Sequence, residues 1–127
     1  MKNYNGWKNY ETWHINLMLR NSQQTESPWL SEAADVWAKA KPTDVWDRSE
    51  SARFSLADTL KDFFGQGIEM AAEAIHRGHK ADDDYCAACD GLMRAGFEEI
   101  EWDEIAAHLL EGQDGFKMPS FPWQKGE

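Results

Sequence analysis

Apolar residues recur at the three- and four-residue spacing of an α-helix along most of the chain, and this periodicity constrains the fold more than any other feature. Tyr10, Trp13 and Leu17, for example, share one stripe behind a candidate N-cap at Asn9. No segment alternates apolar and polar residues long enough to predict a strand, although residues 96–100 come closest. We therefore expect a mainly α-helical protein.

Start and stop signals divide this pattern into about five to six short helices. Asp47 and Glu50 have capping-box spacing, and the helix that they start is expected to stop at Gly65-Gln66-Gly67. Ser27-Pro28 is typical of a first helical turn, so residues 22–26 are interpreted as a polar loop. The expected helices span approximately residues 10–20, 28–41, 47–64, 68–77, 85–95 and 102–111.

The 127 residues fit one domain of ordinary size. A hydrophobic fraction of 42% and an aromatic fraction of 13% exclude a disordered chain. We expect a compact single-domain helical bundle over residues 1–112 and an irregular tail, rich in proline and aromatic residues, over 113–127. The sequence leaves open whether the tail packs on the domain.

No apolar run approaches the roughly 20 residues that span a bilayer, and the N-terminus lacks the apolar region of a signal peptide. These two observations predict a cytoplasmic protein without a membrane partner. The same compartment keeps cysteines reduced, which disfavours a disulfide.

Negative charge is concentrated in one segment. Residues 82–114 contain eleven of the 23 acidic side chains and one basic side chain, Arg94, so this segment alone accounts for the net charge of -10. Such a surface could dock on a basic groove that normally binds nucleic acid, although an acidic face more often serves solubility alone. The candidate partner-binding residues are Asp82, Asp83, Asp84, Glu98, Glu99, Glu101, Asp103 and Glu104.

A His-x-x-His pair is followed closely by a Cys-x-x-Cys pair: His76, His79, Cys86 and Cys89. Two imidazoles and two thiolates are the ligand set of a tetrahedral structural zinc site. The order and spacing match no common zinc finger, and small buried cysteines with histidines near a helix end explain the same residues. We therefore favour a protein without a cofactor and keep zinc as the alternative.

Catalysis and direct nucleic-acid binding have little support in the sequence. No glycine-rich phosphate loop or nucleophile motif is present, so we expect no enzymatic activity. The thirteen basic residues are scattered among acids, whereas phosphate contacts require clustered Lys and Arg. A single-strand nucleic-acid accessory protein with an aromatic stacking platform stays a further alternative.

Two motifs resemble a family found in phage, plasmid and bacterial genomes and classed only as a domain of unknown function. The first is Gly6-Trp7-Lys8-Asn9-Tyr10-Glu11-Thr12-Trp13, and the second is Trp102-Asp103-Glu104-Ile105-Ala106. The resemblance covers most of residues 6–111, but it does not include the Cys86/Cys89 pair. It implies structural roles for Trp7, Tyr10, Trp13, Trp102 and Ile105, with Tyr10, Trp13 and Trp102 meeting in one core.

Small acidic proteins of phages and plasmids often bind host machinery. The resemblance together with the charge predicts a non-enzymatic protein of mobile-element type in the bacterial cytoplasm. Its expected partner is a host protein, such as a basic nucleic-acid-binding defence factor of the CRISPR or restriction type.

Overall fold

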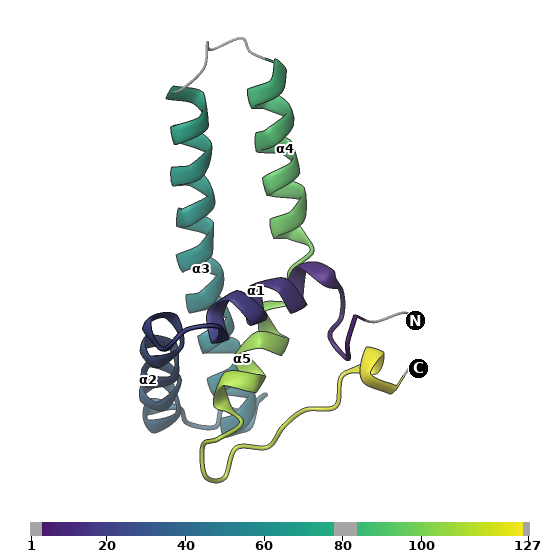
Figure 1. Ribbon diagram of the computed structural model, residues 1–127. Coiled ribbons are helices and arrows are strands. Elements are labelled where there is room, and N and C mark those ends of the chain that lie inside the picture. Colours follow the sequence, from purple (N-terminus) through teal and green to yellow (C-terminus); the bar gives the residue numbers. More distant parts are fainter. Residues whose placement is uncertain (1–3, 78–83, 126–127) are drawn as a thin grey trace.

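The computed structural model describes residues 4–77 and 84–125, with the backbone alone for residues 84–86 and 125 (Figure 1). The described chain forms α1 (Tyr10–Arg20), α2 (Gln23–Lys39), α3 (Arg48–Arg77), α4 (Asp84–Glu98), α5 (Trp102–Leu110) and the 3-10 helix η1 (Pro122–Lys125). No strand occurs in these residues, where the sole β feature is an isolated bridge between Tyr4 and Trp7. The prediction of a mainly α-helical, compact fold with an irregular tail is confirmed.

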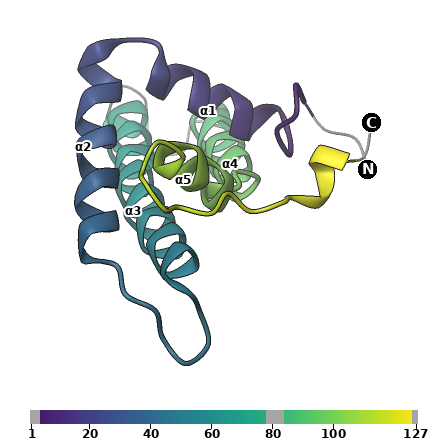
Figure 2. The same cartoon turned by 90° about the horizontal axis from the view of Figure 1, so that it is seen from below.

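The short helix α5 lies in the middle of the molecule, with α1, α2 and α3 around it (Figure 2). Seven of its nine residues are buried, and six of these seven are apolar, so the helix is stable only inside the molecule. Burial of a large aliphatic side chain contributes about 1.5–3 kcal/mol, so α5 organises the core. The core residues are Leu19 of α1, Ala33 and Trp37 of α2, Ala52, Leu56, Ala57 and Leu60 of α3, and Trp102, Ile105, Ala106, Leu109 and Leu110 of α5.

Helix α2 begins five residues earlier than the position of Pro28 predicts. Ser22 is its N-cap and accepts a hydrogen bond from the Thr25 amide, while the Thr25 hydroxyl donates to the Leu19 carbonyl at 2.8 Å. The interpretation of residues 22–26 as a loop is therefore wrong. The Ser22 cap starts the helix, and Pro28 is an exposed residue inside it.

Helix α3 starts at the predicted capping box. The Glu50 amide donates to Asp47 Oδ1 at 2.8 Å, and the Asp47 amide donates back to Glu50 Oε1 at 3.0 Å. The expected stop at residues 65–67 is wrong, because α3 continues through both glycines to Arg77. A Cβ built at Gly65 would lie 3.5 Å from the ring of Phe97, an ordinary van der Waals distance, so this position packs beside Phe97 within an unbroken helix.

The second half of α3 and the whole of α4 form an antiparallel two-helix arm that projects from the body (Figure 1). Arg94 of α4 joins the two helices, since its guanidinium pairs with Asp90 and with Glu69 of α3. Ala72 is buried between them, whereas Met70 and Leu92 are more than two-thirds exposed. The arm therefore adds little to the core.

The C-terminal tail runs back across the helical body (Figure 2). The Lys117 amide donates to the Ser49 hydroxyl at 2.9 Å, which attaches the tail near the start of α3. Further along, Phe121 and Trp123 are buried and pack with Ala107 of α5. These contacts place η1 beside the N-terminal segment, although the two lie at opposite ends of the sequence.

Candidate functional site

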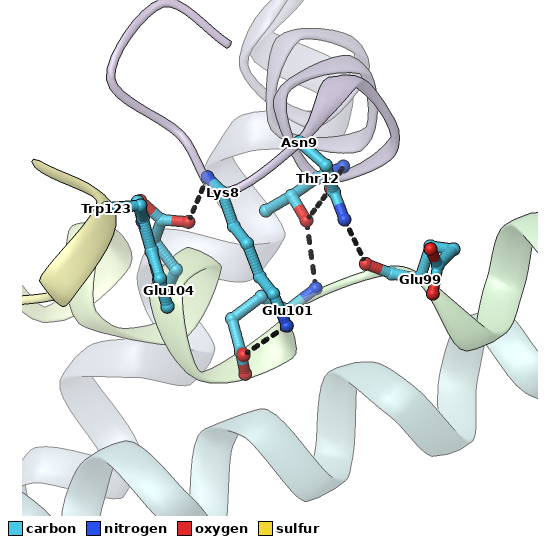
Figure 3. Close-up of polar contacts among 7 residues, drawn as sticks. All are labelled: Lys8, Asn9, Thr12, Glu99, Glu101, Glu104 and Trp123. Carbon is cyan, nitrogen blue, oxygen red and sulfur yellow. Dashed lines mark hydrogen bonds and ion pairs between the residues drawn. The ribbon is translucent and has the colours of Figure 1, made fainter. Parts of the chain in front are cut away.

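A buried carboxylate joins three parts of the chain. Glu104 of α5 is fully buried, and its Oε1 accepts a hydrogen bond from the Lys8 amide at 3.0 Å. Its Oε2 accepts from the indole Nε1 of Trp123 at 2.8 Å (Figure 3). Each oxygen thus has its own N–H donor, one from the N-terminal segment and one from the tail.

Asn9 and Thr12 form a clamp beside this carboxylate (Figure 3). Asn9 Oδ1 caps α1 by accepting from the Thr12 amide at 2.9 Å, and Asn9 Nδ2 donates to the Glu99 carbonyl at 2.6 Å. The buried Thr12 hydroxyl donates to Asn9 and accepts from the Glu101 amide at 2.9 Å. The clamp satisfies main-chain groups that would otherwise be unpaired between α4 and α5.

We call these residues the polar hub: Lys8, Asn9, Thr12, Glu99, Glu101, Glu104 and Trp123. The hub brings residues of the N-terminal motif against residues of the second motif. Its polar groups find their partners within the chain, so its evident effect is to hold the first helix, the last helix and the tail together.

Burial dominates the electrostatics of the hub. Loss of solvent raises the pKa of the Glu104 carboxyl above its ordinary value of 4.5, and the hydrogen bonds from Trp123 and Lys8 oppose that rise. Burial likewise raises the pKa of Asp103, against the effect of Arg53, whose Nε lies 2.7 Å from Asp103 Oδ1. These two acids therefore serve internal contacts.

The predicted acidic face is largely dispersed in the structure. The prediction that Glu104 belongs to this partner-binding face is wrong, because its side chain is inaccessible to a partner. Asp103 pairs with Arg53, and Glu101 Oε2 lies 3.5 Å from Lys8 Nζ. Adjacent residues of a helix point about 100° apart, so Glu104 faces the core while its neighbour Asp103 stays partly accessible, and the charge count alone cannot distinguish the two.

Other members of that face differ in position. Glu98 and Glu99 are exposed at the junction between α4 and α5. Asp84 is the first residue of α4, and its side chain lies outside the described part of the chain, as do Asp82 and Asp83 entirely. Glu98 and Glu99 are thus the described acids of the set that a partner can reach.

All five arginines are engaged within the protein. Arg20 and Arg48 donate to the main-chain carbonyls of His108 and Trp37, at 2.9 and 2.7 Å. The other three pair with acids: Arg53 with Asp103, Arg77 with Glu73, and Arg94 with Asp90 and Glu69. Arg20, Arg48 and Arg53 are thus held by partly buried contacts, whereas Arg77 and Arg94 are exposed on the arm and pair with acids there.

The expected meeting of Tyr10, Trp13 and Trp102 in one core is wrong. Trp102 is buried against Phe64 and Phe97, with ring centroids 5.3 and 5.6 Å away. Tyr10 is 49% exposed and forms a surface cluster with Tyr4, Trp13 and His14. Trp7 is the aromatic residue of the first motif that packs against the core, and its ring lies on His108.

The candidate zinc ligands are only partly described. His76 lies in the last turn of α3 with its Nε2 3.9 Å from Asp90 Oδ2, and Cys89 is an exposed free thiol. His79 and the side chain of Cys86 lie outside the described residues. Within the described part, no group of three or more His, Cys, Asp or Glu side chains is placed to hold a metal. The four-ligand site stays a prediction.

An open apolar groove of about 610 Å³ lies where α1, α2 and α3 meet. Sequence reasoning did not predict this groove, although the adjacent pair Phe63-Phe64 was an available signal, because adjacent helical residues point about 100° apart and both rings rarely face one core. Phe64 stacks on Trp102 and also lines the groove. The other lining residues are Met18, Leu19, Gln24, Thr25, Pro28, Trp29, Glu32, Thr59 and Phe63.

No family model matches the chain, and neither a curated protein nor a solved structure matches it. No helix in the described ranges is long and apolar enough to cross a bilayer.

Proposed function

We propose that this protein is a non-enzymatic binding protein of the mobile-element type, which attaches to a basic host protein through its acidic surface. The partner class is a nucleic-acid-binding defence factor of the CRISPR or restriction type. The proposal rests on charge and on the resemblance of the two motifs.

One observation carries the proposal: each arginine already has a partner within the protein, while many exposed carboxylates of the described residues have no ion pair. Each ion pair joins one positive and one negative charge, so the pairs leave the net charge of -10 unchanged and that charge belongs to acids outside them. A basic partner would be steered toward such a surface. Exposed acids without an ion pair among the described residues include Asp44, Asp58, Asp62, Glu98, Glu99 and Asp114.

The same distribution disfavours direct binding to nucleic acid. Phosphate recognition relies on clustered guanidinium and ammonium groups. The exposed lysines Lys41, Lys61 and Lys117 come from three different segments and are separated by acidic residues. We therefore expect the protein to bind a nucleic-acid-binding protein and not to bind the nucleic acid itself.

The test is capture of partners from a bacterial host with a variant that carries Glu98→Lys and Glu99→Lys. Both side chains are exposed, and the hub uses only the main-chain carbonyl of Glu99, so the fold should persist. We expect basic nucleic-acid-binding proteins among those captured by the unmodified protein and their loss with the variant.

A matched control changes the same net charge elsewhere, with Asp44→Lys and Asp114→Lys in two exposed loops. Loss of capture with the control as well would indicate a general charge effect without a defined face. Equal capture by all three proteins would refute the proposal.

A further inference from the structure

The groove between α1, α2 and α3 has aromatic side chains that are fixed from the core. Phe63 is 58% exposed, and its ring meets Trp29 edge-on with centroids 5.4 Å apart. Trp29 stacks on Phe64, and Phe64 stacks on the buried Trp102, with centroids 6.4 and 5.3 Å apart. A surface that is already ordered loses little conformational entropy when it binds a ligand. The groove is therefore prepared for an apolar or aromatic group.

Glu32 of α2 is the one charged side chain among the described residues that line the groove. It is partly buried, and within the described part of the chain its carboxylate forms no hydrogen bond or ion pair. One carboxylate matches one positive charge, whereas a basic protein segment would bring several charges that the lining leaves unmatched. The charge of the lining thus favours a ligand with a single cationic group.

The hydrogen-bonding capacity of the lining points the same way. The Thr25 hydroxyl donates to the Leu19 carbonyl at 2.8 Å, and the Thr59 hydroxyl donates to the carbonyl one turn earlier in α3 at 3.1 Å. Each hydroxyl has one proton, so both can only accept from a ligand, as the Glu32 carboxylate does. Gln24 can donate or accept. A ligand group that donates, such as an ammonium group, therefore finds more partners here than a carboxylate does.

We propose that this groove binds a small apolar amine, with its hydrocarbon part against Trp29 and Phe63 and its ammonium group at Glu32. The groove volume of about 610 Å³ lies within the range of roughly 300–1,000 Å³ that is usual for small-molecule sites. The net charge of -10 attracts a cation and repels an anion. The inference goes beyond the proposed function and is independent of it, because Glu98 and Glu99 do not line the groove.

Three probes with one carbon skeleton test the charge requirement: 4-phenylbutylamine, 4-phenylbutan-1-ol and 4-phenylbutyrate. Titration of the full chain at pH 7, followed by the NMR shifts of its backbone amides, measures each Kd and locates the contact. We expect shifts in residues 18–32 and 59–64. The amine should bind most tightly, the alcohol at least about threefold more weakly, and the acid more weakly still. High salt should reduce the difference between the amine and the alcohol.

Variants of Glu32 test the site of the ammonium group. Glu32→Gln keeps the size of the side chain and removes its charge, so it should weaken the amine to the affinity of the alcohol and leave the alcohol within about twofold. Asp35→Asn is the matched control, because it makes the same change in charge on the same helix at an exposed residue outside the lining. It should leave the preference for the amine in place.

A variant of Phe63 tests the site of the hydrocarbon part. Phe63→Ser should weaken the amine and the alcohol at least about fivefold, because it removes an apolar contact that both probes share. Met70→Ser is the control, since Met70 is 71% exposed on the arm and outside the lining. Both substitutions are at exposed positions, and circular dichroism with thermal melting confirms that each variant is folded.

Four outcomes would overturn the inference: no binding of the amine, equal binding of the amine and the alcohol, an unchanged preference in Glu32→Gln, or equal effects of Phe63→Ser and Met70→Ser. A dimer that Phe63→Ser abolishes would also overturn it and make a second copy the occupant.

The variant with Glu98→Lys and Glu99→Lys separates this inference from the proposed function. It should bind the amine within about twofold of the unmodified protein, because both residues lie outside the lining. Amine binding without capture of a host protein would support the groove and refute the proposed function. Capture that depends on Glu98 and Glu99, without amine binding, would support the proposed function and refute the groove.

Discussion

The indole Nε1 of Trp123 donates a hydrogen bond to Glu104 Oε2 at 2.8 Å, and this contact fixes the tail on the central helix. The other oxygen of the same carboxylate holds the Lys8 amide. One buried acid thus connects segments that are separated by more than a hundred residues of sequence. Removal of this carboxylate should have a measurable effect on stability.

Glu104→Ala should lower the free energy of unfolding by about 2–5 kcal/mol, because it leaves two buried N–H donors without an acceptor. Urea denaturation followed by tryptophan fluorescence measures the loss. Glu98→Ala is the control, since that side chain is exposed, and it should change stability by less than about 0.5 kcal/mol. Equal stability of the two variants would show that the carboxylate does not hold the tail.

His108 should make stability depend on pH. Burial lowers the pKa of His108 below its ordinary value of 6.5, so protonation is less favourable in the folded state than in the unfolded state. Its contribution is therefore complete above pH 6.5 and is lost as pH falls through the lowered pKa. Unfolding measured across this range should show the decline in the unmodified protein and less of it in His108→Gln. His14→Gln provides the matched control, and an NMR titration of His108 at or above 6.5 would contradict the prediction.

Trp102→Ala should cost about 3–5 kcal/mol, because it opens a cavity against Phe64 and Phe97. Tyr10→Ala should cost less than about 1 kcal/mol, because that side chain is half exposed in the surface aromatic cluster. The melting temperatures of the two variants show which of these motif residues belongs to the core and which lies at the surface. A larger loss for Tyr10→Ala would restore the expectation of a shared core.

Gly67→Ala tests the continuity of α3. Nothing lies within 4 Å of a Cβ built at Gly67, and the residue is helical, so alanine should stabilise the protein by about 0.5–1 kcal/mol. Chemical denaturation is sufficient to detect this gain. No gain, or a loss of stability, would indicate that the helix breaks near residues 65–67, as sequence reasoning predicts.

Sequence patterns predicted the helix caps correctly, because a cap is a contact between residues close together in the chain. The Asn9 cap and the Asp47–Glu50 capping box join residues three apart, so their spacing in the sequence is their spacing in space. The same reasoning misjudged Gly65 and Gly67, because a glycine costs a helix only about 1 kcal/mol and the packing of α3 against other helices decides whether the helix continues. Pro28 was misjudged because the Ser22 cap, a stronger local signal, begins the helix earlier.

The sequence by itself determined that this protein is helical, what caps two of its helices, and that its acids outnumber its bases. Only the tertiary structure decided which of those charges a partner can meet. Glu104 became a buried acceptor, Asp103 an ion-pair partner of Arg53, and Phe63 an exposed part of a groove. Helical propensity and capping depend on neighbours along the chain, whereas burial depends on how the finished helices pack, and packing selects one face of each helix to hide.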